Sequence, residues 1–170
     1  MIRVQSEDFD VGAELARFGA GNPRIGGICV FVGLVRDLTD VTPLGVPSHD
    51  ASGGRTKPVA AMTLEHYPGM TENALATIEQ EARARWPLED VLVVHRFGRL
   101  EPCERIVLVA TASAHREAAF DSCHFLIDWL KTKAPFWKRE ETPAGGQWVD
   151  ARASDDAAAA RWTQVPKTGS

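Results

Sequence analysis

The chain has 170 residues, of which 44% are hydrophobic, and a formal net charge of −4 at pH 7. This length and apolar content suit one globular domain with a buried core, while the acidic balance argues against a general nucleic-acid-binding protein. No apolar run approaches the roughly 20 residues that span a bilayer, and the first ten residues lack the apolar core of a secretory signal, so we expect a cytoplasmic protein.

Three cysteines stand far apart in the sequence, at Cys29, Cys103 and Cys123. Their odd number and the absence of a C-x-x-C spacing argue against a disulfide framework and a zinc site, so we expect no bound metal. Cys29 lies in an apolar run and Cys123 on the apolar side of a helical pattern. We therefore expect both to be buried as small hydrophobic residues.

The first part of the chain predicts a strand, a helix and a second strand. Residues 2–4 suit a short strand, and residues 11–18 suit a short helix that stops at Gly19 and Gly21. Residues 25–35, IGGICVFVGLV, form a nearly continuous apolar run rich in β-branched residues. Such a run is typical of a central strand.

The segment after this strand is irregular. Arg36 stands at the end of the strand, where it is either a solvated edge residue or a contact for an anion. Residues 38–58 contain prolines, glycines and serines with little periodicity, which predicts a mobile loop or insertion. We do not interpret His49 and Asp50 in this loop as a metal site, because a lone pair of this kind is usually solvated.

The middle of the chain alternates strands with a helix. Residues 59–66 predict a strand, and a turn at residues 67–69 leads into a helix that stops before Pro87. Residues 91–99 and 105–112 are apolar runs joined by a short turn, which indicates an antiparallel pair. The apolar positions on one face of the helix are Met70, Ala74, Ile78 and Ala82.

A second, longer helix follows, which Ser113 is placed to cap and which Pro135 ends. Its apolar face is marked by Ala119, Cys123, Leu126 or Ile127, and Leu130.

Short elements follow this helix. Residues 136–142 and 147–152 predict a small β unit, and residues 154–162 have the pattern of a capped, alanine-rich helix. Residues 163–170 resemble a frayed tail.

Residues 130–141, LKTKAPFWKREE, concentrate four cations, two aromatics and a proline in twelve residues. Lys131 falls on the last turn of the helix, whereas Lys138 lies in extended chain, so both can approach one pocket. Lysines at a helix end are also favoured by the helix dipole whatever the protein does, and Phe136 with Trp137 can be ordinary core residues. The spacing alone leaves both interpretations open.

Three motifs, in this order, resemble the large, catalytic subunit of molybdopterin synthase. They are LEHYPGM at residues 64–70, TASAHR at residues 111–116 and LKTKAPFWKRE at residues 130–140. The resemblance covers roughly residues 1–162, which we expect to form a single domain. It implies an α/β (α+β) fold of the hammerhead type with a small additional antiparallel β subdomain.

The same resemblance implies a sulfurtransferase of molybdenum cofactor biosynthesis. In this family a small ubiquitin-like sulfur-carrier protein, with a C-terminal Gly-Gly thiocarboxylate, donates sulfur to cyclic pyranopterin monophosphate. Two rounds make the dithiolene of molybdopterin. The family works as a homodimer flanked by two carrier subunits, a heterotetramer, and no membrane or nucleic acid is involved. No metal or organic cofactor is implied for catalysis, because molybdenum is inserted later in the pathway.

The residues make chemical sense of this role, because a phosphate and a thiocarboxylate are both anions and need fixed positive charge to meet. By resemblance, Lys131 and Lys138 are the expected catalytic residues. Lys131 is expected nearest the carrier terminus, stabilising an acyl intermediate or moving a proton, and Lys138 is expected in substrate binding and catalysis. The expected substrate-binding residues are Arg36, His115, Arg116, Lys131, Lys138, Arg139 and Glu140.

The carrier's tail has to reach the site as extended chain through a narrow channel. Phe136 and Trp137 are candidates to line that channel. Packing in the core of the small β unit is the other interpretation of both aromatics.

The long helix separates two groups of these residues. His115 and Arg116 open it and Lys131 closes it, sixteen residues after His115, which corresponds to roughly 24 Å at 1.5 Å per residue. If both ends serve one substrate, His115 and Arg116 must come from the partner protomer. The helix N-terminus also favours an anion there, although His115 can equally be a solvated residue at the start of a helix.

Three features depart from the family pattern. Leu34 stands where a basic or polar residue is expected, so we expect no ligand role for its side chain. Cys103 replaces an expected turn glycine. The loop at residues 38–58 is longer than expected and either covers the substrate or stays disordered.

Two other classes of function remain as alternatives. A non-catalytic scaffold would dock a ubiquitin-like protein and hold an anion without turnover, but the retention of Lys131 and Lys138 favours the enzyme. An RNA-binding module built on the same cations is disfavoured by the acidic net charge and by the absence of an RNP-type signature.

Overall fold

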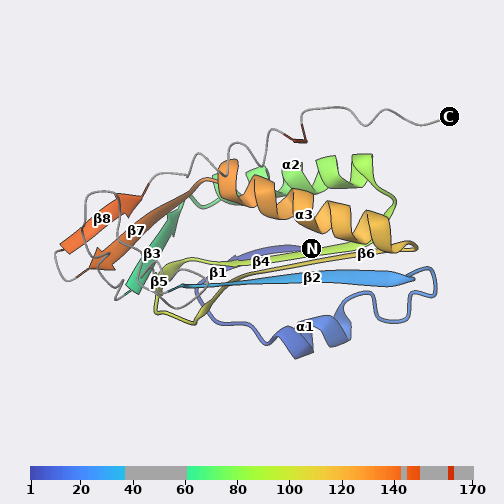
Figure 1. Cartoon of the computed structure of the whole chain (residues 1–170), viewed down its shortest axis with the longest axis horizontal. Coiled ribbons are helices and arrows are strands. Elements are labelled where there is room, and N and C mark those ends of the chain that lie inside the picture. Colours follow the sequence, from blue (N-terminus) through green and yellow to red (C-terminus); the bar gives the residue numbers. More distant parts are fainter. Residues whose placement is uncertain (37–60, 143–144, 150–160, 163–170) are drawn as a thin grey trace, which may run out of the picture.

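The structure, a computed structural model, describes residues 1–36, 61–142, 145–149 and 161–162. Within them the chain forms two four-stranded sheets and three helices (Figure 1). The first sheet has the order β1 (Ile2–Gln5), β4 (Leu88–Arg96), β6 (Arg105–Ser113) and β2 (Gly27–Leu34). The second has the order β5 (Gly98–Leu100), β3 (Ala61–His66), β7 (Phe136–Thr142) and β8 (Gly145–Val149). The helices are α1 (Val11–Arg17), α2 (Met70–Arg85) and α3 (Arg116–Thr132).

Helices cover both faces of the first sheet, with α2 and α3 on one face and α1 on the other (Figure 1). Side chains of β4 alternate between the two resulting cores: Val91 and Val93 lie under α2 and α3, whereas Leu92 and Val94 lie on the side of α1. A strand buried on both faces carries a continuous apolar run, and residues 91–94 of β4 form such a run. The mixed α+β architecture confirms the expected fold class.

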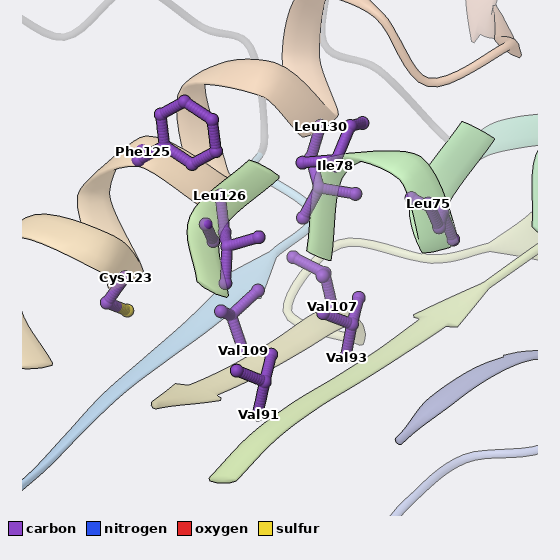
Figure 2. Close-up of a cluster of buried hydrophobic side chains, with 11 residues drawn as sticks. Leu75, Ile78, Val91, Val93, Val107, Val109, Cys123, Phe125, Leu126 and Leu130 are labelled. Carbon is purple, nitrogen blue, oxygen red and sulfur yellow. The ribbon is translucent and has the colours of Figure 1, made fainter. Parts of the chain in front are cut away.

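The core under α2 and α3 is the larger of the two (Figure 2). Phe125 and Leu126 on α3 are almost completely buried: Leu126 points toward the valines of the sheet, whereas the Phe125 ring packs against Trp86 and Trp162. Burial of a side chain of this size contributes about 2 kcal/mol to folding. This core therefore holds α3 firmly on the sheet.

The helix starts follow from local chemistry. The Asp10 carboxylate accepts a hydrogen bond from the Ala13 N–H at 2.8 Å and caps α1. At the start of α2, Gly69 adopts a φ of +83°, and the Glu72 carboxylate accepts its N–H at 2.6 Å. The turn expected at residues 67–69 is thus confirmed.

The prediction that Ser113 caps α3 is wrong. The N-cap residue is His115, and the Ser113 hydroxyl donates to the Pro87 carbonyl at 2.8 Å and accepts from the His115 N–H at 3.5 Å. Ser113 is the last residue of β6 and is completely buried, so the sheet determines its direction. The sequence pattern did not reveal how far the strand runs before the helix begins.

The prediction of a central strand at residues 25–35 is also wrong in its position. β2 is an edge strand, which pairs only with β6 among the described residues. Its exposed large apolar side chains are Ile28, Val30, Phe31 and Leu34, with exposures of 37–52%. An apolar run is typical of a central strand, but an edge strand can have the same composition when another protein surface binds to its exposed apolar side chains.

The expected apolar face of α2 is shifted by one position in its first half. The buried residues are Thr71, Leu75, Ile78 and Ala82. Met70 is instead 51% exposed, because it is the first residue of the helix and projects beyond the sheet-facing stripe. The predictions for Ile78 and Ala82 are confirmed.

The second sheet packs at one end of the first. The chain passes from β4 into β5 at Gly98, whose φ of +92° is one that glycine adopts without strain. The buried residues Val35, Met62, Leu64 and Leu100 form the small core of this junction. Since β7 and β8 follow α3 directly and belong to the second sheet, the junction also determines where the chain goes after α3.

Other expectations are confirmed or lie beyond the described residues. β4 and β6 form the expected antiparallel pair, and β7 with β8 forms the expected β unit. The loop at 38–58, all but the last two residues of the helix at 154–162 and the tail at 163–170 lie outside the described residues. Within the described part of the chain, no helix is both long and apolar enough to cross a membrane.

We expect Cys103→Gly to stabilise the protein. Cys103 has a φ of +72°, and its N–H donates to the Val35 carbonyl at 2.8 Å, so the conformation is fixed by the turn. A residue with a side chain destabilises the folded protein by about 1–2 kcal/mol when its φ is positive in this way. Glycine removes this cost but has more conformational freedom in the unfolded chain, so the net gain in stability is about 0.5–1 kcal/mol. Urea unfolding measures the change. The control, Cys103→Ala, keeps a Cβ, and an equal gain in that variant would contradict the explanation.

Candidate functional site

The segment of residues 130–141 begins at the end of α3. Thr132 is the last helical residue, and Lys133 closes the helix with its N–H donating to the Trp129 carbonyl at 2.7 Å. Lys131 lies exposed on the last turn, as predicted. Pro135 cannot continue the helix, and the chain then enters β7.

Pairing with β3 determines which side of the second sheet each residue of β7 occupies. Directly opposite residues of antiparallel strands share a face, and Lys138 lies opposite Leu64, whereas Trp137 lies opposite Glu65. Leu64 belongs to the buried core of the junction, so the half-buried Lys138 is on the inner face. Trp137 and Arg139 alternate with it and are exposed on the outer face.

Phe136 is packed where the two sheets meet. Its ring is stacked on the His95 ring with centroids 3.8 Å apart, and it lies 6.2 Å from the His66 ring. Trp137 instead contacts Tyr67 edge-on at 4.8 Å and is 42% exposed. The two candidate channel aromatics therefore differ: Phe136 is a junction residue, and Trp137 is accessible from outside.

His95 is a functional neighbour that the sequence interpretation missed. Burial, opposed by a hydrogen bond with the Arg96 carbonyl at 2.9 Å and reinforced by His66, lowers the pKa of His95 to about 4. The imidazole is therefore neutral at neutral pH and suits stacking on Phe136. The signal was weak, because one histidine in an apolar strand is usually a core residue.

Arg36 lies at the same end of the molecule as Lys131. Its neighbour Val35 is buried and donates to the Glu104 carbonyl at 2.8 Å, which ties this stretch to the turn before β6. The first residues of β6 in turn lie under the end of α3, where Leu130 packs in the same core as Val107. Arg36 itself is exposed.

Ion pairs surround this turn. The Arg105 guanidinium pairs with Asp8 and holds the pKa of that carboxyl below its ordinary value. Arg96 is buried and donates to the Arg105 carbonyl at 3.0 Å and to Glu104 at 3.4 Å. Because a buried guanidinium is stable only when it is paired, this network fixes the turn beside Arg36.

His115 and Arg116 lie at the opposite end of α3 (Figure 1). Both are exposed, and the neighbouring Gly26 donates to the Ser113 carbonyl at 3.0 Å. The 17 residues of α3 span about 25 Å at 1.5 Å per residue. The predicted separation of His115 and Arg116 from Lys131 within one chain is therefore confirmed.

The structure thus brings together some of the expected site residues and not others. Near the junction of the two sheets lie Arg36, Lys131 and Lys138, whereas Arg139 is on the outer face of β7 and His115 and Arg116 lie at the far end of α3. Glu140 is in β7 and is paired with Met62 in the register of the two strands. Among the described residues, no three His, Cys, Asp or Glu side chains gather as a metal site would require.

These features define a mixed α+β protein of two sheets, with cations gathered near the place where the sheets meet. The family model described as MoaE protein matches residues 4–133, and the chain belongs to this family. The resemblance inferred from the three sequence motifs is therefore confirmed.

Similar proteins match nearly the whole chain. The molybdopterin synthase catalytic subunit of Ralstonia nicotianae is 52% identical over 169 residues, which are 99% of this chain and 88% of that protein. The molybdopterin biosynthesis MoaE protein of Burkholderia ambifaria is 53% identical, with a TM-score of 0.76 over 97% of this chain and 99% of that one. Molybdopterin synthase from Staphylococcus aureus has 26% identity and a TM-score of 0.72, covering 87% and 96%.

We expect the buried His95 to make stability depend on pH. Its folded-state pKa of about 4 lies below the ordinary value of 6.5, so the unfolded chain binds this proton first. The contribution is fully present above pH 6.5 and is lost as pH falls toward 4, by about 3 kcal/mol in all.

Urea unfolding between pH 7.5 and 4.5 measures this dependence. The wild type should lose more stability over this range than His95→Gln, whereas the exposed control His115→Gln should lose as much as the wild type. Equal pH dependence in wild type and His95→Gln would contradict the assignment.

Proposed function

We propose that this chain is the catalytic subunit of a molybdopterin synthase, a cytoplasmic sulfurtransferase of molybdenum cofactor biosynthesis. It converts cyclic pyranopterin monophosphate to molybdopterin with sulfur from the C-terminal thiocarboxylate of a small ubiquitin-like carrier subunit. The observation that carries the proposal is the placement of Lys131 and Lys138 near the junction of the two sheets, in a chain of the MoaE family.

The chemistry requires two anions to meet. A thiocarboxylate and a phosphate repel one another, and fixed cations lower that repulsion without having to reorganise during the reaction. Lys131 lies on the last turn of α3, and Lys138 comes from the inner face of β7. Cations held by two different elements can flank the carrier terminus and the substrate at once.

We assign separate roles to these lysines. Lys131 is exposed, so the carrier terminus can reach it, and it stabilises the negative charge on the acyl group or moves a proton. Lys138 is half-buried and binds the pterin substrate while it takes part in catalysis. Arg36, Arg139 and Glu140 complete the substrate site.

The carrier tail approaches along the aromatics of β7. Trp137 is exposed beside Tyr67, where an incoming extended segment can contact both rings. Phe136 contributes from the other face by keeping the start of β7 on His95. Phe136 thus lines the channel from a position that its stacking on His95 holds fixed.

We propose a homodimer as the core of the assembly, formed through the open edge of β2. That edge exposes Ile28, Val30, Phe31 and Leu34, and a second copy of the chain can cover them. Two carrier subunits then complete a heterotetramer. The free-thiol cysteines within each chain are consistent with a cytoplasmic location.

The dimer also explains why the site residues lie at two ends. In an antiparallel two-fold pairing, the Gly27 end of one β2 strand meets the Leu34 end of the other. Gly27 lies beside the start of α3, since a Cβ on it would lie 3.7 Å from the Arg116 Cα. Such a pairing brings His115 and Arg116 of one chain toward Arg36 and Lys131 of the other.

Single-turnover formation of molybdopterin tests the catalytic assignment. With cyclic pyranopterin monophosphate and a thiocarboxylated carrier, Lys131→Ala and Lys138→Ala should each slow turnover about a hundredfold or more, because each removes a charge that stabilises the reaction. Carrier binding, measured separately, should be unchanged. The matched control is Lys133→Ala, which removes an exposed cation placed over the Trp129 ring and should leave turnover unchanged. Wild-type protein that binds the carrier but makes no dithiolene would instead be a scaffold.

Mixing two inactive variants tests whether the site is shared between chains. The variant Lys131→Ala and the double variant His115→Ala/Arg116→Ala are mixed at equal concentration, and their subunits are allowed to exchange between dimers. Half of the resulting dimers are mixed, and in each of them one site is intact if His115 and Arg116 act across the interface. Activity should then recover to about a quarter of the wild-type value. No recovery, despite verified exchange of subunits, would show that each chain uses only its own residues.

A further inference from the structure

Two thiols from distant parts of the sequence meet between β2 and α3. Cys123 lies on the sheet-facing side of α3 in the larger core and is 3% exposed (Figure 2). Cys29 is half-buried in β2 and packs against the same core. Cys29 lies opposite Thr111 on β6, whose hydroxyl donates to the Ala119 carbonyl one turn before Cys123. The strand and the helix thus hold both thiols over one point of the sheet.

Cys29 and Cys123 share the same part of the core. Burial, and then the neighbouring Cys29 side chain, raise the pKa of the Cys123 thiol above its ordinary value, and Thr111 opposes this shift. Small residues lie where strand and helix approach one another: Ala119 on α3 is 2% exposed, and a Cβ on Gly27 would lie 3.7 Å from the Arg116 Cα. A disulfide needs Cα atoms roughly 4.4–6.8 Å apart, which only such closely packed elements provide.

We propose that Cys29 and Cys123 are a site of oxidative modification, at which a hydroperoxide converts the two thiols to a disulfide that ties the edge strand β2 to helix α3. The proposal does not depend on sulfur transfer. It concerns a pair of side chains that the candidate functional site does not use.

The chemistry proceeds in two steps that balance. The half-buried Cys29 thiol first gives its proton to water, and the thiolate so formed attacks one oxygen of hydrogen peroxide. The O–O bond breaks, the products are a sulfenic acid and hydroxide, and the hydroxide takes up the released proton to form water. The Cys123 sulfur then attacks the Cys29 sulfur, its proton leaves with the departing hydroxide, and a second water forms. The two thiols together lose two electrons and peroxide gains them. Because Cys123 is buried with a raised pKa, the second step is slow and the pair responds to sustained rather than brief oxidation.

The cross-link joins residues that are 94 positions apart. A disulfide over a loop of this length stabilises the folded chain mainly by restricting the unfolded one. For a chain of this size we expect the Tm to rise by about 5–10 °C. It would also fix the edge strand that exposes Ile28 and Val30 against the helix behind it.

Mass spectrometry of the full-length protein tests the proposal, with Cys103 as an internal control. Cys103 is exposed on a turn far from both thiols in the sequence, so it should react but not join them. The variant Cys103→Ser removes competing chemistry at the surface. After treatment of this folded variant with hydrogen peroxide, unfolding in urea and alkylation, we expect a mass lower by two hydrogen atoms, no alkylated cysteine and a Cys29–Cys123 linked peptide. The Tm should rise and fall back on addition of a dithiol reductant.

Two outcomes would overturn the proposal. In one, Cys29 and Cys123 are both still alkylated after oxidation of the folded protein, while peroxide oxidises Cys103 in the wild type. In the other, the linked peptide forms only when the chain is oxidised in urea. The variants Cys29→Ser and Cys123→Ser in the Cys103→Ser background give the corresponding baseline, since neither can form the link. If one of these variants fails to fold, the proposal is tested by the Cys103→Ser protein alone, by comparing the yield of linked peptide after oxidation in the folded state and in urea.

Discussion

The packing of α3 on the first sheet is the constraint on which the arrangement of the candidate site depends. Leu126 packs the helix on the valines of β4 and β6, and Phe125 packs it against Trp86 at the end of α2. The 17 residues of α3 keep His115 and Lys131 about 25 Å apart. Any function that needs both ends at one substrate therefore needs two chains, and any function of one chain must use one end alone.

The second constraint lies where the chain leaves α3. Pro135 ends the helix, and the next residue, Phe136, is fixed by its stack on a neutral His95. This stack places the first residue of β7, and strict alternation along the strand then assigns Lys138 to the inner face and Trp137 to the outer one. The same strand can consequently offer an accessible aromatic to a protein partner and a half-buried cation to a small anion.

Sequence reasoning predicted the elements well where periodicity and helix-ending residues agreed. The end of α3 near Pro135, the extended chain after it and the distance between His115 and Lys131 all follow from local rules. It did not predict that β2 is an edge strand, because an apolar run reports hydrophobicity and not the number of neighbours. Nor did it identify His95, whose role comes from a ring 41 positions away and is invisible to any local pattern.

The edge position of β2 connects features that the sequence presented separately. Its uncovered apolar side chains favour a second chain, its Gly27 end lies beside Arg116, and its other end leads through Val35 to Arg36. Between these ends Cys29 reaches back to the core of α3. A shift of this strand by one residue along β6 would make its side chains exchange faces. The helix behind the strand and the second chain of the proposed dimer would both select apolar side chains here, so this edge strand has the composition of a central one.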